Sequence, residues 1–162
     1  MVDPHPDLPA SAQRVHEALS RQGLDSRLVE LPVAARTSQQ AADALGVEVG
    51  RIAKSLVFRA VTSSSAVLVI AAGDRRVDER RVAAALGEPI ERATPEFVRA
   101  HTGFAIGGVA PVGHPQSLAT FVDASLRRFD QVWAAGGTPH CVFPIAPADL
   151  VIASGGREIE IG

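Results

Sequence analysis

The sequence lacks the residues and segments that would give it a disulfide framework, a membrane span or a secretion signal. Its 162 residues contain a single cysteine, Cys141, which excludes an intrachain disulfide and a cysteine-based structural zinc site. No apolar run reaches the roughly 18–20 residues of a membrane helix, and residues 1–10 have neither the basic nor the apolar region of a signal peptide. These absences predict a cytoplasmic protein in a reducing compartment.

Lysine is almost absent as well. Of the 16 basic residues only Lys54 is a lysine, and the others are arginines. Arginine carries a flat guanidinium that is always charged, whereas the compact ammonium of lysine changes its pKa when it is buried. Lys54 is therefore a candidate functional residue. The alternative, that one lysine is retained by chance, stays open on this argument alone.

The composition is sufficient for one folded domain. Hydrophobic residues make up 46% of the chain and charged residues 21%, with a net charge of −2, so a chain of this length can bury a single core. We expect residues 1–10 to be a flexible N-terminus and residues 11–162 to form one domain. The acidic balance argues against broad binding to duplex DNA but permits recognition of an RNA end.

Capping residues and apolar periodicity predict the secondary structure. Helices are expected at 11–22, after the N-caps Thr37, Asp78 and Thr94, and at 147–151 before a glycine-containing tail. Apolar runs rich in β-branched residues predict strands at 26–31, 51–61, 66–72, 132–134 and 140–145, and one around Phe121. The runs 51–61 and 66–72 should form a hairpin near the centre of the sheet. Interleaved helices and strands predict an α+β domain with a mixed sheet.

Two glycine-rich loops are candidate ligand sites. The loop 102–113 follows neither the P-loop nor the dinucleotide-binding glycine spacing. Its Gly107-Gly108 pair, with Pro111, can bring backbone N–H groups close to a carbonyl or oxyanion, or can be a purely structural turn. A second pair, Gly136-Gly137, precedes His140, which is either an acid, base or donor near neutral pH or an ordinary edge histidine.

Other motifs give weaker indications. The sequence has no HExxH, no GxSxG and no paired-histidine spacing, so neither a metal site nor a catalytic triad is predicted. Cys141 lies in an apolar run and is expected to be a buried, inert thiol. The pairs 75–76, 80–81 and 127–128 are arginines that could touch phosphates, but acidic neighbours favour solvated faces.

Three segments together resemble a known family. Residues 52–58 (IAKSLVF), 102–113 (TGFAIGGVAPVG) and 135–137, followed by 148–150, are similar to the YbaK/EbsC-type aminoacyl-tRNA deacylases. The same domain occurs as the editing insert of bacterial prolyl-tRNA synthetases, and the order of elements agrees over residues 11–154. The resemblance implies a mixed, mostly antiparallel or barrel-like sheet with flanking helices. It also implies a pocket that hydrolyses the ester between a wrong amino acid and the tRNA 3′ end.

The resemblance also assigns roles to individual residues. Lys54 matches the signature lysine of the family, and Gly107 and Gly108 match its glycine-rich substrate loop, so these three are the expected catalytic residues. The expected substrate-binding residues surround them in the sequence motifs or in the second glycine loop: Thr37, Phe104, Ile106, Val109, Ala110, Pro111, Gly136, Gly137 and His140. Thr37 alone is more typical of a helix cap than of a catalytic group.

The implied reaction needs no metal, cofactor or protein nucleophile, because an aminoacyl ester is already activated and the terminal ribose hydroxyl can orient water. The implied partners are the 3′ end of an aminoacylated tRNA, foremost tRNA(Pro), and prolyl-tRNA synthetase, with no DNA and no membrane. Alanine, serine, threonine and cysteine remain open as substrates. Val142 stands where cysteinyl-tRNA(Pro) deacylases tend to carry an acidic residue, which weakens the case for cysteine and points to His140 as a selector. The alternative is a non-catalytic module of the same fold that binds tRNA ends or a synthetase.

Overall fold

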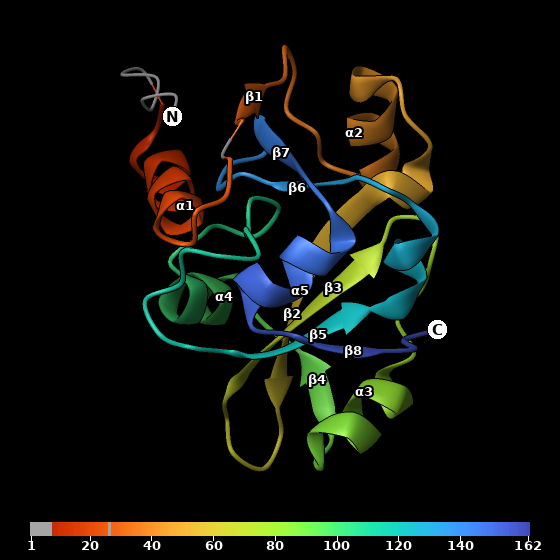
Figure 1. Ribbon diagram of the computed structural model, residues 1–162. Coiled ribbons are helices and arrows are strands. Elements are labelled where there is room, and N and C mark those ends of the chain that lie inside the picture. The colour runs from red at the N-terminus through yellow and green to blue at the C-terminus, as the bar shows by residue number, and fades with distance from the viewer. Residues whose placement is uncertain (1–7, 26) are drawn as a thin grey trace.

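The computed structural model describes residues 8–25 and 27–162 (Figure 1). Its helices are α1 (Ala10–Arg21), α2 (Ser38–Leu45), α3 (Glu79–Leu86), α4 (Pro95–Thr102) and α5 (Pro147–Ser154), with 3-10 turns at Val49–Arg51 and Ala124–Arg128. Its strands are β1 (Val29–Glu30), β2 (Ile52–Ala60), β3 (Ala66–Ala72), β4 (Ile90–Arg92), β5 (Ala119–Asp123), β6 (Val132–Ala135), β7 (Cys141–Ile145) and β8 (Arg157–Ile159).

The predicted N-caps begin three of the helices. The Thr37 hydroxyl accepts from the Gln40 backbone N–H at 3.1 Å, and the Thr94 hydroxyl accepts from the backbone N–H of Phe97 at 3.1 Å. The Asp78 carboxylate accepts from the backbone N–H of Arg80 at 3.0 Å. These bonds satisfy amide groups that have no partner within the first turn, which is why a local pattern predicts where each helix begins.

The strands form one mixed sheet of eight strands in the order β1-β7-β6-β2-β3-β5-β8, with β4 pairing separately with β2. Four of the seven pairings are antiparallel and three are parallel. The predicted α+β class, the mixed sheet and the central β2–β3 hairpin are confirmed. In the described part of the chain β1 and β8 end the sheet on opposite sides, so the sheet is the open form and not the barrel-like one.

Three short strands differ from the prediction. β8 forms where we expected only a tail, because residues 157–159 pair in parallel with β5. β4 was not predicted; it pairs with residues 58–60 of β2. The predicted strand 26–31 is reduced to β1, which pairs with β7, and residue 26 lies outside the described residues. Each of these strands is two or three residues long and depends on a partner distant in the sequence.

The core lies on both faces of the central strands. Every residue of β3 is buried, and its side chains alternate between two apolar clusters as the pleat requires. One cluster joins the sheet to α1, α4 and α5, and the other joins it to α3 and Ile161. Figure 1 shows α1, α4 and α5 grouped on one part of the sheet, with α3 at the other end beside β4. A strand covered on both faces explains the continuous apolar run at 66–72.

A small apolar cluster holds Leu8, the first described residue of the chain, against α1 and β7. Of the predicted flexible segment, residues 1–7 lie outside the described residues. Leu8 is buried with Ala12 of α1 and Cys141 of β7. Cys141 itself is buried, and burial raises the pKa of its thiol. A thiol held protonated in this way has little thiolate at neutral pH, as expected for an inert cysteine.

Candidate functional site

The candidate site lies at a gap in the hydrogen bonding of the sheet. On the edge of β2 that faces away from β3, β6 pairs with Ile52 and Ala53, and β4 pairs with residues 58–60. Neither strand reaches residues 54–57. A pocket of about 910 Å³ opens at this edge and is lined by all four of these residues. Its other walls come from the loop before α2, the β3–α3 loop, the 103–113 loop and the β6–β7 loop.

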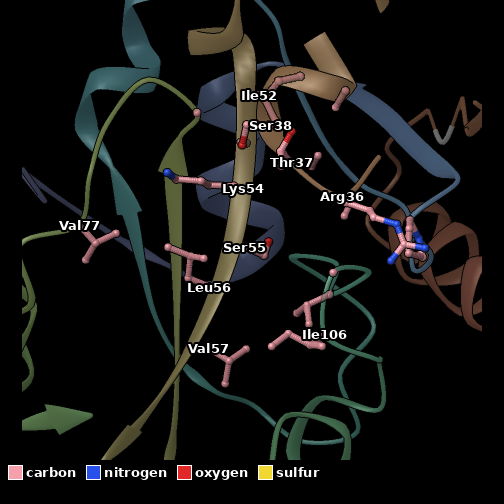
Figure 2. Close-up of a pocket in the computed structure, with 18 of the residues that line it drawn as sticks. Arg36, Thr37, Ser38, Ile52, Lys54, Ser55, Leu56, Val57, Val77 and Ile106 are labelled. Atoms are coloured by element: carbon pink, nitrogen blue, oxygen red, sulfur yellow. The ribbon is translucent and has the colours of Figure 1, made fainter. Parts of the chain in front are cut away.

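Lys54 projects from β2 into this pocket (Figure 2). Its Nζ donates a hydrogen bond to the Arg75 carbonyl oxygen at 2.8 Å. Partial burial lowers the pKa of Lys54, while the carboxylates of Asp74 and Asp123 oppose this effect and favour the ammonium form. Because an ammonium has three N–H donors and Arg75 uses one, two remain for a ligand.

The β3–α3 loop, residues 73–77, is anchored at its first residues. The Gly73 backbone N–H donates to the Ile52 carbonyl at 2.7 Å, and a Cβ on Gly73 would collide with the Val49 carbonyl oxygen. The buried Asp123 carboxylate accepts from the Ala72 backbone N–H at 3.0 Å. These contacts hold the backbone that carries the Arg75 carbonyl at a defined distance from Lys54.

A second anchor of this loop is an ion pair between Asp74 and Arg128. The guanidinium donates two parallel hydrogen bonds to the carboxylate, at 2.8 and 2.9 Å, and lies over the Phe129 ring. This bidentate geometry lowers the pKa of Asp74 chiefly through the Arg128 hydrogen bond. The pair fixes Asp74, the second residue of the loop, to the Ala124–Arg128 turn.

We expect Arg128→Gln to lower the melting midpoint at neutral pH by about 1–3 °C, because partly exposed ion pairs contribute little. The pKa of Asp74 lies below its ordinary value of 3.8 in the folded protein. Its contribution is therefore present above pH 3.8 and is lost as pH falls through the lower folded value. Melting curves at a series of pH values should show wild type and variant converging in acid. A difference that grows below pH 3.8 would contradict this assignment.

Five of the residues predicted from the sequence line the pocket: Lys54, Thr37, Ile106, Gly107 and Val109. Ile106 is 60% exposed at the pocket mouth, opposite β2 in Figure 2. Gly107 has a φ of 88°, which non-glycine residues rarely adopt, and open space around it. The Thr37 hydroxyl is used as the helix cap.

The other predicted residues are placed around the pocket but do not line it. A Cβ on Gly108 would lie 2.9 Å from the Thr138 Cα, so the two glycine loops touch through this residue. Gly136 and Gly137 permit equally close packing against neighbouring segments. Phe104, Ala110 and Pro111 are buried. His140 is exposed outside the lining, and its carbonyl oxygen accepts from the Leu31 N–H at 2.6 Å.

Sequence reasoning missed several residues of the site. Ser55 follows Lys54 in the motif, but its side chain points to the opposite side of β2 (Figure 2). Its Oγ is buried and has no hydrogen-bond partner in the described part of the chain. The Asp74–Arg128 pair joins positions 54 residues apart, so no local signal could reveal it. Gly73 directly follows the apolar strand β3. A glycine at that position was the one local feature of the sequence that could have indicated a tight loop there.

The described residues contain neither a candidate metal site nor a candidate membrane span. No group of three His, Cys, Asp or Glu residues there could hold a metal ion. None of the helices in residues 8–25 and 27–162 combines the length and hydropathy needed to cross a membrane.

The fold and the pocket define an α+β domain with a ligand-sized cleft beside its single lysine. A family described as "Aminoacyl-tRNA editing domain" matches residues 33–152, a stretch that includes Lys54 and both glycine loops. The chain belongs to this family of aminoacyl-tRNA editing domains.

The chain is also similar to two curated proteins and to a solved structure. The chain is 31% identical to "Uncharacterized protein YwhH" of Bacillus subtilis (strain 168), over 86% of this chain and 88% of that protein. It is 26% identical to "Putative Cys-tRNA(Pro)/Cys-tRNA(Cys) deacylase EbsC" of Enterococcus faecalis, over 77% and 76% of the two chains. A crystal structure of "a putative trans-editing enzyme for prolyl tRNA synthetase" superposes with a TM-score of 0.89 and 43% identity, covering 96% of this chain and 98% of that one.

Proposed function

We propose that this protein is a trans-editing hydrolase that removes a small non-cognate amino acid from mischarged tRNA(Pro). Its family and the names of its relatives support an aminoacyl-tRNA substrate. The observation that carries the proposal is the position of Lys54. The single lysine of the chain lies in a large pocket at the unpaired part of β2, with its ammonium held in place by Arg75.

The chemistry required of the pocket is modest. An aminoacyl ester is already activated, so the enzyme has to position water and stabilise the negative charge that develops on the carbonyl oxygen. The two remaining N–H donors of Lys54 are suited to the ester carbonyl or to a phosphate next to it. Burial lowers the pKa of Lys54, and the carboxylates of Asp74 and Asp123 oppose this effect. Because its Nζ already donates to the Arg75 carbonyl, we assign Lys54 the role of a hydrogen-bond donor in this reaction and not that of a nucleophile.

The opposite side of β2 is suited to the amino-acid part of the substrate. Val57, Val98 and Val109 line the pocket there, and the buried Ser55 hydroxyl adds one polar group. An apolar wall with a single hydroxyl suits a small amino acid and gives a polar group that could read its amine or hydroxyl. The Gly107 turn, at the mouth, can bring backbone N–H groups near the ester. A partnership with prolyl-tRNA synthetase is part of the same proposal.

The test is deacylation of tRNA(Pro) charged separately with alanine, cysteine, serine, threonine or proline. We expect rapid hydrolysis of one or two mischarged esters while prolyl-tRNA(Pro) stays intact. That pattern would identify the substrate. Hydrolysis of all five esters, or of none above the spontaneous rate, would overturn the editing proposal. The second result would favour a non-catalytic module that binds tRNA ends or a synthetase.

A further inference from the structure

Four arginines surround the mouth of the pocket without carboxylate partners. Arg36, Arg75, Arg76 and Arg92 are exposed and contribute to the pocket lining. No ion pair joins any of them to a carboxylate in the described part of the chain. Several arginines elsewhere form ion pairs, among them Arg51 with Asp130, Arg59 with Glu91 and Arg127 with Glu158. Other arginines without an ion pair in the described residues are scattered outside the pocket lining: Arg14, Arg80, Arg99 and Arg157.

The charge of the pocket is opposite to that of the whole protein. Its lining contains five cationic side chains, the four arginines and Lys54, but only two acidic ones, Asp74 and Glu79. Asp74 is already bound by Arg128. The chain as a whole has 18 acidic and 16 basic residues. Positive potential is therefore concentrated at this mouth, while the rest of the surface repels polyanions.

The four arginines come from three separate segments. Arg36 precedes α2, Arg75 and Arg76 belong to the β3–α3 loop, and Arg92 ends β4, where it lies opposite Phe58 of β2. Figure 2 shows Arg36 and the β3–α3 loop, marked by Val77, on opposite sides of β2. Cationic groups thus flank the route to Lys54 from both sides.

We infer that Arg36, Arg75, Arg76 and Arg92 form a phosphodiester-binding rim that guides the single-stranded 3′ end of the tRNA into the pocket. This inference rests on the proposed function and adds the source of affinity for the RNA. A guanidinium presents parallel donors that match phosphate oxygens, and arginine is the residue that suits this contact best. The rim does not act on the ester, so it should affect capture of the RNA and not the chemical step.

The experiment compares two substrates that carry the same amino acid. One is the mischarged tRNA(Pro) that the protein hydrolyses best, and the other is that amino acid esterified to the 3′ hydroxyl of adenosine, which has no phosphate. The rim variant replaces Arg36, Arg76 and Arg92 with alanine and leaves Arg75, whose carbonyl binds Lys54, unchanged. The matched control replaces three exposed arginines outside the pocket lining with alanine, which changes the net charge equally: Arg21, Arg99 and Arg157.

We expect the rim variant to lose about 100-fold or more in kcat/KM on tRNA and less than about twofold on the adenosine ester. The slope of log kcat/KM against log salt on tRNA should flatten by about 2, since each of the three single-strand phosphate contacts contributes about 0.7. The control variant should keep most of its activity on both substrates. Melting curves should show that both variants fold.

The inference is overturned if the rim variant loses activity equally on both substrates, keeps the wild-type salt slope, or behaves like the control. If wild type hydrolyses neither substrate, the proposed function fails. Binding of uncharged tRNA(Pro), measured over a salt series, then decides the inference by itself. Salt-sensitive binding lost only in the rim variant supports it, and equal binding by all three proteins refutes it.

Discussion

Lys54→Ala is expected to reduce deacylation by about 100- to 1,000-fold, the usual effect of removing one donor from a site of developing negative charge. The Lys54 ammonium lies in the pocket and has two free N–H donors, and no other lysine exists to replace it. The side chain is only partly buried, so the free energy of unfolding should change little. Single-turnover hydrolysis of the preferred mischarged tRNA, beside a thermal melt, measures both quantities.

Two further substitutions separate charge from shape at this position. Lys54→Met keeps most of the length without the charge and should be as inactive as Lys54→Ala. Lys54→Arg keeps the charge, but its planar fork cannot occupy the position of the compact ammonium at the Arg75 carbonyl, and most activity should be lost. Arg59→Ala, on the same strand and outside the pocket lining, is the matched control. Full activity in both Lys54→Ala and Lys54→Arg would refute a role for this residue.

The pH dependence of the same reaction follows from the burial of Lys54. Its pKa is lowered from the ordinary value of 10.5, so the ammonium loses its proton at a lower pH than an exposed lysine would. Enzymatic hydrolysis, corrected for the spontaneous rate, should therefore begin to fall with rising pH before 10.5 is reached. Lys54→Arg should show no such fall in its residual activity, because a guanidinium stays protonated over this range.

Gly73→Ala is expected to cost about 3 kcal/mol or more in the free energy of unfolding and to impair deacylation as well. The added Cβ would collide with the Val49 carbonyl oxygen and would lie 3.0 Å from the Ser38 Cβ. Because the first obstacle is backbone, the β3–α3 loop has to move. That movement breaks the hydrogen bond between Gly73 and Ile52 and displaces the Arg75 carbonyl that binds Lys54.

The control for Gly73→Ala is Gly46→Ala. Gly46 has a φ of 69° but no atom within 4 Å of an added Cβ, so its substitution tests backbone conformation without a collision and should cost about 1 kcal/mol. Chemical denaturation measures both variants, and deacylation measures the displaced loop. Equal stability of the two variants would contradict the close packing at Gly73.

The helices and the central hairpin were predictable because their signals are local. Thr37, Asp78 and Thr94 cap helices through bonds to residues two or three positions later. The run 66–72 is apolar at every position because both of its faces are covered, and that composition is visible without knowing the cover. The family motif likewise identified Lys54 and the 103–113 loop as parts of one site.

The short strands and the pocket walls could not be predicted in this way. β4 and β8 have too few residues for a periodic pattern, and each exists only because it pairs with a strand elsewhere. The unpaired stretch at residues 54–57 depends on where β6 and β4, which pair with the same edge of β2, end. Nor could the sequence show that Gly108, Gly136 and Gly137 each lie where neighbouring segments approach too closely for a side chain. Their predicted roles, Gly108 in catalysis and Gly136 and Gly137 in substrate binding, stay predictions.

Sequence alone was enough to predict the fold class, the starts of the three helices capped by Thr37, Asp78 and Thr94, and a lysine that lines the pocket, because capping bonds, apolar periodicity and a motif act over a few neighbouring residues. The helix predicted at 147–151 continues to Ser154. Tertiary structure decided which groups surround that lysine. The Asp74–Arg128 pair, the anchoring of the β3–α3 loop by Asp123 and the four arginines at the pocket mouth all bring together positions far apart in the chain. Such contacts depend on how the whole sheet is assembled, and no short segment encodes them.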